Sequence, residues 1–317
     1  MTVPVEGYGC PMSEFVEVAS GLRFPEGPVV LQDGSIALVE MFGKCITRIA
    51  SDGSKTKLAD VPGGPNGLAL GPDGALYICN NGGSFGEVDF FGLTFPGPMN
   101  PDDYVGGRIQ RLNLATGELR DLYTHCGEVA LRGPNDLVFD RHGGFYFTDH
   151  GIRFGRQADI SSIYYATTDG STIREVVHPT DSPNGIGLSP DGETLYWAET
   201  HTGRVFKAAI TGPGEVAHHS PIDPSALLVG LAGLQLFDSL AVDGEGNVCV
   251  ATLGLQVSGI TVVSPSGEVL RQVLTGDPLT TNICFGGADM RTAYITLSGT
   301  GRLVSVQWPC AGLRLNA

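Results

Sequence analysis

Short runs of alternating apolar and polar residues, separated by Gly- and Asp-rich turns, follow one another along most of the chain. Four stretches share one outline: "FPEGPVVLQDGSIALVE", starting at Phe24, then "GPNGLALGPDGALYICN", "GPNDLVFDRHGGFYFTD" and "SPNGIGLSPDGETLYWAE". A period of two is typical of strands, and Asp-Gly between two apolar runs is typical of hairpin turns. No helical period is sustained anywhere, so the pattern predicts repeated β-hairpins.

One polar position recurs at the start of each hairpin, as a glutamate in the first copy and an asparagine in the next three. Seven residues further on stands an Asp, Glu or His, and the residue after it is glycine in five of the six copies that this register finds. We call the recurring polar residues the anchors: Glu26, Asn66, Asn135, Asn184, Asp238 and Asn282.

A third strand follows the hairpin in most copies, and successive anchors lie 40 to 69 residues apart. Units of this length with three or four strands are typical of propeller blades. The sequence therefore predicts an all-β protein whose residues 1–317 form one six-bladed β-propeller domain. Residues 15–19 and 303–308 are expected to pair in the same blade and close the ring. A solenoid is the alternative for any repeat, but it would carry atypical polar caps at both ends.

Composition limits the partners and the compartment. The chain has 46 glycines and 20 prolines, which suits many short strands and tight turns, and a net charge of −15, which opposes binding to nucleic acid. It shows neither a signal-peptide pattern nor a run of about 18 apolar residues. A cytoplasmic protein without a membrane partner is expected. The seven scattered cysteines form no C-x-x-C pair and are expected to be reduced.

The anchors predict a metal site. If each anchor starts the innermost strand of its blade, all six converge at one mouth of the central channel. Carboxylates placed so close together repel one another unless a cation lies between them, and a hard divalent ion binds carboxylate and amide oxygens. Alternatively, each anchor caps its own turn, a role that suffices for Asn66 and Asn282.

Several motifs carry a family resemblance, namely "PEGP", "PND" followed by "FTD", "SPNGIGLSPDG", "LYWAET" and "CFGGADMRTAYIT". In this order they resemble the senescence marker protein (regucalcin), gluconolactonase and luciferin-regenerating enzyme family of six-bladed propellers. The resemblance implies a metal-dependent hydrolase, with one divalent ion held by Glu26, Asn184 and Asp238. It also implies that Asn135 contacts metal-bound water or substrate. Calcium is the favoured ion, with zinc, magnesium or manganese as alternatives.

The sequence departs from the animal sugar lactonases of this family beside the third anchor. Those enzymes have an arginine two residues before the asparagine, whereas here Gly133 stands there and Arg132 is one residue further back. Sugar specificity is therefore not implied, although Arg132 remains a candidate substrate contact. His150 and His201, which follow the second strands of blades three and four, are further candidates.

The residues around these candidates have structural roles. Asp149 and Glu199 are expected to hold loops together. Asp136 is expected to point away from the channel, because side chains alternate along a strand.

Blade two contains an insertion at residues 82–107, rich in Phe, Gly and Pro. Long loops in compact domains are commonly lids or binding loops. Three phenylalanines here, Phe85, Phe90 and Phe91, are candidate substrate contacts, and with Phe95 they would be costly to leave in water. An apolar lid indicates a substrate less polar than a free sugar acid.

The function that these predictions favour is hydrolysis of a lactone or related cyclic ester. The ion would polarise the carbonyl and acidify a water, Asp238 would bind the ion and accept the proton of that water, and Asn135 and Asn184 would orient the reacting groups. No strand-to-helix elbow carrying G-x-S-x-G is expected, because no helical period is sustained, so a serine nucleophile is not supported. The alternatives are a non-catalytic calcium- or ligand-binding propeller and a paraoxonase-like esterase or organophosphate hydrolase. The pattern indicates no oligomeric state.

Overall fold

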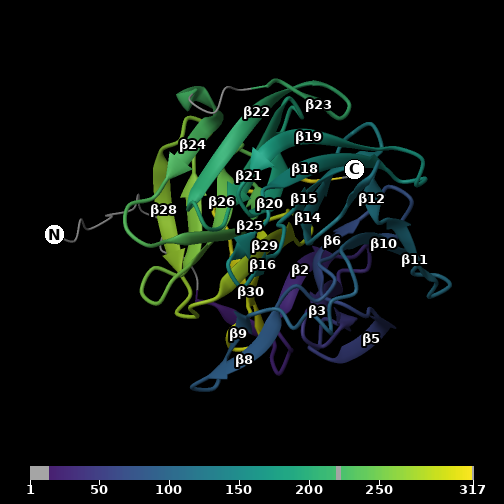
Figure 1. Cartoon of the computed structure of the whole chain (residues 1–317). Coiled ribbons are helices and arrows are strands. Elements are labelled where there is room, and N and C mark those ends of the chain that lie inside the picture. The colour runs from purple at the N-terminus through teal and green to yellow at the C-terminus, as the bar shows by residue number, and fades with distance from the viewer. Residues whose placement is uncertain (1–13, 219–222, 316–317) are drawn as a thin grey trace.

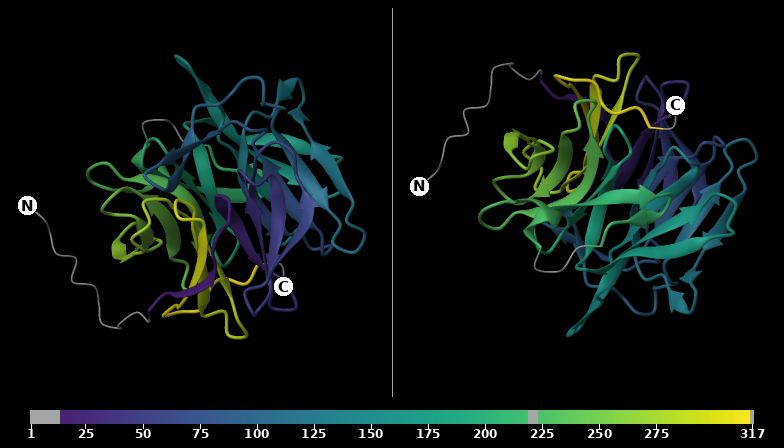
Figure 2. Two further views of the ribbon diagram at one scale, coloured as in Figure 1. Left: turned by 90° about the horizontal axis from the view of Figure 1, so that it is seen from below. Right: turned by 90° about the horizontal axis from the view of Figure 1, so that it is seen from above.

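The chain forms six sheets arranged as blades around a central channel in a computed structural model, which describes residues 14–218 and 223–315 (Figure 1). Every blade is an antiparallel sheet whose first strand lies innermost. The colour follows the ring from blade to blade in the views of Figure 2. The predicted six-bladed propeller is confirmed.

The first three blades have the following strands. Blade one contains β2 (Pro25–Val30), β3 (Ile36–Glu40), β4 (Cys45–Ile49) and β5 (Lys55–Asp60). Blade two contains β6 (Pro65–Leu70), β7 (Leu76–Asn80), β10 (Arg108–Leu112) and β11 (Leu119–Tyr123). Blade three contains β14 (Pro134–Phe139), β15 (Gly144–Asp149), β18 (Ser161–Thr167) and β19 (Ile173–Thr180).

The other three blades complete the ring. Blade four contains β20 (Pro183–Leu188), β21 (Thr194–Glu199) and β22 (Arg204–Gly212), and β22 pairs with both β23 (Glu215–Val216) and β24 (Leu227–Gly230). Blade five contains β25 (Leu236–Val242), β26 (Val248–Leu253), β27 (Gly259–Val263) and β28 (Val269–Leu274). Blade six contains β29 (Thr280–Gly286), β30 (Thr292–Leu297), β31 (Arg302–Gln307) and β1 (Val16–Ala19).

Short elements decorate the blades. Three small hairpins are formed by β8 (Gly86–Phe90) with β9 (Leu93–Gly97), β12 (His125–Cys126) with β13 (Val129–Ala130), and β16 (Arg153–Phe154) with β17 (Gln157–Ala158). A single 3₁₀ turn, Pro224–Ala226, precedes β24.

The N-terminal strand closes the ring, as the sequence predicts. Strand β1 pairs with β31 as the outermost strand of blade six, with Val16 opposite Ser305. The purple start of the chain accordingly lies beside the yellow C-terminal strands in Figure 2. Leu22 N–H also donates to the Gly301 carbonyl at 2.9 Å. This bond connects the segment that leads into blade one with blade six.

The hydrophobic core is divided among the gaps between neighbouring blades. Between blades one and two, Val39 and Ile46 are buried against Leu68 and Ile78. A similar cluster of aromatic and aliphatic side chains fills the gap between blades two and three. Burying a side chain of this size contributes about 1.5–3 kcal/mol, so the frame is stabilised by contacts away from the channel mouths.

The described residues contain neither a membrane-spanning helix nor a disulfide. In the ranges 14–218 and 223–315, no helix is long and apolar enough to cross a membrane. Six of the seven cysteines lie in these ranges and all six have free thiols, as predicted. Cys10 lies outside the described residues.

A register shift interrupts every inner strand beside its anchor. In β2 it falls between Glu26 and Val29, and in β14 between Pro134 and Leu137. The other four inner strands shift at the equivalent place. Such a bulge breaks the alternation of side chains and bends the strand. Consecutive residues next to the anchor can therefore both face the channel.

Candidate metal and catalytic site

The second strand of a blade holds the anchor in place. In blade three the carboxylate of Asp149, at the end of β15, accepts hydrogen bonds from the backbone N–H groups of Arg132 and Gly133, both at 2.7 Å. In blade four Glu199 accepts from Asp181 N–H at 3.2 Å. The expectation that Asp149 and Glu199 hold loops together is confirmed. These bonds secure the backbone two or three residues before each anchor.

In blades one and two, the polar residue at the end of the second strand also accepts a backbone hydrogen bond. Glu40 accepts from Arg23 N–H at 2.8 Å, and Asn80 accepts from Gly64 N–H at 3.0 Å. The signal in the sequence is the polar residue that ends the second strand in blades one to four, in "ALVE", "YICN", "YFTD" and "YWAE".

Three carboxyl groups interact at the anchor mouth, from Glu26, Asp136 and Asp238. Glu26 is only 2% exposed; burial raises its pKa well above the usual range, and the nearby charges of Asp238 and Asp136 raise it further. Burial also raises the pKa of Asp238 to about 7, with Asp136 adding to the effect and a hydrogen bond from Asn184 opposing it. Asp238 is less buried than the other two.

The expected direction of Asp136 is wrong. Its carboxyl is buried within the channel, where it interacts electrostatically with Glu26 and Asp238, and burial raises its own pKa to about 7. The bulge in β14 breaks the alternation on which the expectation rested. The sequence does set Asp136 apart from its counterparts, because the residue after the anchor is glycine in blades one, two and four. A Cβ on Gly27 would lie 2.6 Å from the Leu68 backbone nitrogen of the next blade.

The polar atoms of this mouth fit a divalent cation. Glu26 Oε2 and Asn135 Oδ1 are buried without a hydrogen-bond partner among the described residues, and an unsatisfied buried oxygen is costly. Asn184 donates its Nδ2 to Thr200 Oγ1 at 3.1 Å, which orients its amide. Carboxylate and amide oxygens of this kind suit calcium or another hard ion.

The donor set mixes carboxylates with amides. Within the described part of the chain, no three His, Cys, Asp or Glu side chains come together as a metal-binding group. That result fits the predicted ligand set, in which Glu26 and Asp238 are joined by the amide of Asn184.

The two remaining anchors have protein partners. Asn282 Oδ1 accepts from the N–H of Ile283 at 2.8 Å, a local bond of the capping kind that the sequence suggests. Asn66 Nδ2 donates to Met41 Sδ at 3.7 Å, and Asn81 Nδ2 donates to the same sulfur at 3.5 Å. Asn81 is a polar residue of this mouth that the sequence interpretation missed.

The two candidate histidines are neighbours. The ring centroids of His150 and His201 are 5.8 Å apart, and the ring of Phe85 lies 5.7 Å from that of His150. Burial, followed by the proximity of His201, lowers the pKa of His150 to about 4. His150 is therefore a neutral imidazole at physiological pH, suited to hydrogen bonding rather than to pairing with an anion.

Arg132 is occupied elsewhere. Its Nε donates to Asp159 Oδ2 at 3.0 Å, and its guanidinium lies 5.9 Å from the centroid of the Tyr104 ring. The ion pair draws the side chain toward Asp159, so we do not retain Arg132 as a substrate contact. Both partners are distant in sequence, which is why local patterns gave no warning.

The insertion in blade two crosses over neighbouring blades. It contains the β8–β9 hairpin, which the sequence interpretation treated as a loop. Thr94 N–H donates to the Gly299 carbonyl of blade six at 2.9 Å, and Tyr104 Oη donates to the Arg132 carbonyl of blade three at 2.7 Å. These two bonds tie the insertion to blade six, on one side of blades one and two, and to blade three, on the other side.

The four phenylalanines of the insertion divide into two pairs. Phe85 and Phe95 pack against the buried cluster of Phe24, Met41 and Leu279. Phe90 and Phe91, at the hairpin tip, are instead 59% and 91% exposed. The expectation that all four are covered is therefore wrong for the tip pair, because a two-stranded hairpin carries its turn away from the blade surface. Phe90 and Phe91 are not retained as substrate contacts.

Comparison with known proteins identifies the family. The sequence pattern of the SMP-30/Gluconolactonase/LRE-like region matches residues 24–299. The chain belongs to this family. It is 27% identical over 254 residues to the lactonase drp35 of Staphylococcus epidermidis, with 78% of this chain and 69% of that protein covered. The drp35 lactonase of Staphylococcus aureus matches equally at 27% over 248 residues, covering 77% of this chain and 67% of the relative.

Solved structures share the fold of this family member. A gluconolactonase from Xanthomonas campestris superposes with a TM-score of 0.73 at 22% identity, covering 93% of this chain and 89% of that one. The calcium-binding protein regucalcin from Agrobacterium tumefaciens gives 0.69 at 17% identity, covering 93% and 95% of the two chains. At these identities the likeness establishes the propeller alone.

Proposed function

We propose that this protein is a metal-dependent lactonase that opens the ring of a lactone or related cyclic ester. The observation that carries the proposal is the pair of orphaned buried oxygens, Glu26 Oε2 and Asn135 Oδ1, in the mouth that also holds the carboxyl of Asp238. Family membership and the drp35 lactonases support the reaction class.

Glu26, Asn184 and Asp238 would hold the ion, and calcium suits their oxygen donors best. When bound, a divalent ion supplies Lewis-acid polarisation of the substrate carbonyl and acidification of water. The ion would also balance the negative charge of the two ionised carboxylates in this buried mouth.

Asp238 is the general base of the proposed reaction. Its carboxylate takes one proton from the attacking water while the water oxygen forms a bond to the carbonyl carbon. The ring C–O bond then breaks, the proton passes to the leaving alkoxide, and the product is one hydroxy acid. Asp238 suits this task because it is less buried than Glu26 and Asp136, which gives water access to it.

The amide of Asn135 would orient the substrate, because an amide N–H can donate to the oxygen on which charge develops. Phe85 and the neutral pair of His150 and His201 would contact the ring or its substituent. Arg132 stands one residue further back than the arginine of the sugar lactonases and is paired with Asp159, which argues against a grip on the hydroxyls of a sugar. A lactone with an apolar substituent is the substrate class that these contacts favour.

A substrate panel tests the proposal. Chelated protein is reloaded with Ca²⁺, Mg²⁺, Mn²⁺ or Zn²⁺ and assayed on gluconolactone, on aliphatic lactones, on aryl esters and on a phosphotriester. We expect the highest kcat/KM on an aliphatic lactone, complete loss on chelation, and a fall of at least ~100-fold in Asp238→Asn. Glu118→Gln, an exposed change of the same kind, should keep the parent rate. A fully chelated sample that kept its rate would refute the metal-dependent reaction, and ion binding without turnover on any substrate would favour the binding propeller.

A further inference from the structure

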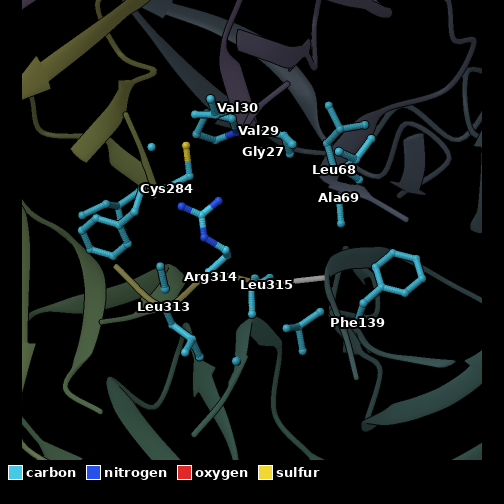
Figure 3. A pocket seen from close by; sticks show the side chains of 18 of the residues that line it. Gly27, Val29, Val30, Leu68, Ala69, Phe139, Cys284, Leu313, Arg314 and Leu315 are labelled. Atoms are coloured by element: carbon cyan, nitrogen blue, oxygen red, sulfur yellow. The ribbon is translucent and has the colours of Figure 1, made fainter. Parts of the chain in front are cut away.

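The channel has a second mouth, where the inner strands end. A cavity of about 800 Å³ opens there, lined by residues from all six blades (Figure 3). Its inner end is marked by the anchor Asn282 and by Gly27 and Asp136, each of which follows an anchor. Its outer end is marked by Leu313, Arg314 and Leu315, near the C-terminus. Nothing in the proposed lactonase reaction uses this cavity.

The walls of the cavity are apolar and incompletely covered. In β2 and β6 the first four residues are buried, whereas the last two, Val29 and Val30 in one and Ala69 and Leu70 in the other, are only partly buried. These side chains line the cavity. Concave apolar surface with a few polar groups is the usual composition of a small-molecule site.

The C-terminal segment is fixed across this mouth by backbone hydrogen bonds. Gly312 N–H donates to the Met290 carbonyl at 2.8 Å and Leu313 N–H to the Val242 carbonyl at 3.1 Å. Leu313 also packs against the apolar cluster between blades four and five. These contacts hold the next residue, Arg314, at the rim, and its guanidinium extends into the cavity in Figure 3.

Arg314 has no acceptor among residues 14–218 and 223–315, although the chain has an excess of 15 negative charges. Seven other arginines of the described residues form ion pairs with carboxylates. The one acidic side chain among the described residues that line the cavity is Asp136, at the opposite, inner end. The cavity therefore has a cation at its entrance, apolar walls and a carboxyl at its floor.

We propose that this cavity binds an aliphatic monocarboxylate, with the carboxylate on Arg314 and the chain directed along the inner strands toward the anchors. Arg314 decides the orientation, because it attracts the carboxylate to the entrance and leaves the apolar inner strands to the chain. In blade one the lining runs from Gly27 to Gln32, and its strand part, Gly27 to Val30, is about 10 Å long at ~3.3 Å per residue. That depth suits a medium-length chain such as that of octanoate.

The test is calorimetric titration of octanoate into the full-length, calcium-loaded protein. We expect saturable binding with one site. Arg314→Gln removes the charge and should weaken binding by about tenfold or more, the effect of losing one hydrogen bond to a charged group. Arg120→Gln makes the same change on the outer strand of blade two, where Arg120 is exposed, and should leave the affinity unchanged. Octanol should bind more weakly than octanoate.

A charge reversal separates this cavity from the anchor mouth. Arg314→Glu should lose octanoate and acquire affinity for octylammonium, which the parent protein should bind weakly. Absence of saturable octanoate binding to the parent would overturn the proposal. So would an affinity that Arg314→Gln leaves intact, since the ligand would then be bound elsewhere, and so would equal losses in Arg314→Gln and Arg120→Gln, since the effect would then be one of net charge.

Discussion

In the absence of the ion, the free energy of unfolding of the protein should fall as the pH rises from about 4 to about 7. Asp238 has a pKa of about 7 in the folded, metal-free chain and an ordinary value of 3.8. Between these values the folded state binds more protons than the unfolded state, so the free energy of unfolding falls as pH increases. The stability is fully present below pH ~4 and is lost as the pH passes through ~7. Asp136 has the same two values and adds to the effect.

The size of the fall follows from the difference in pKa. A rise from 3.8 to about 7 at Asp238 is about three units, and each unit corresponds to ~1.4 kcal/mol, which amounts to about 4 kcal/mol. For a chain of this length ~1 kcal/mol shifts the Tm by about 2 °C. The Asp238 contribution alone therefore corresponds to a Tm about 8 °C lower at pH 8 than at pH 4. His150, whose pKa burial lowers to about 4, opposes part of this fall, because its neutral form is favoured by folding as the pH rises.

The assay is thermal unfolding of the protein in chelator and in excess Ca²⁺ across this pH range. Calcium favours the ionised carboxylates, so the Tm gained on adding calcium should grow from pH 5 to pH 8. Asp136→Asn should reduce the pH dependence of the chelated protein, whereas the exposed change Glu118→Gln should leave it intact. A chelated Asp136→Asn variant with the same pH dependence of Tm as the chelated parent would show that these carboxyl groups are not forced together.

Three further substitutions test single residues. Glu26→Gln removes an orphaned charged ligand, so the metal concentration needed for half-maximal activity should rise by tenfold or more while added ion restores part of the rate; an unchanged metal requirement would place the ion elsewhere. Asp149→Asn removes an acceptor of backbone N–H groups and should cost about 1–3 kcal/mol in urea unfolding, and an unaltered midpoint would contradict that role. Phe85→Ala should raise KM for apolar lactones, whereas Phe91→Ala, at the exposed tip, should not; equal effects would argue against the contact of Phe85 with substrate.

The parts of this molecule that could be predicted from its sequence are the ones that repeat. The anchors, the hairpin turns seven residues later and the third strands recur in register, so each copy supports the others and the number of blades follows. Ring closure could be predicted as well, because a ring must close and one short strand precedes the first anchor while another follows the last. Repetition does not predict the direction or the partners of a side chain at a position where one blade differs from the rest.

The positions whose surroundings the sequence did not reveal depend on such differences and on distant contacts. Asp136 occupies a place that is glycine in three other blades, and a bulge turns it into the channel. Arg132 pairs with Asp159, and only the folded loop brings the two together. The hairpin in the insertion could have been found from the alternation in "GEVDFFGLTFPG", whose Phe91 and Gly92 both have positive φ, as a type I′ turn requires.

This fold can hold three repelling carboxyl groups at one mouth, because its stability comes from the contacts between blades. The apolar clusters lie between blades and provide most of the burial. The anchor mouth contributes repulsion among Glu26, Asp136 and Asp238 instead. A small domain could not tolerate that cost, but a ring of six packed sheets can, because no single gap between blades depends on these carboxyl groups. This repulsion would favour a bound cation, so the residues that destabilise the mouth without an ion are the same ones that would make it a metal site.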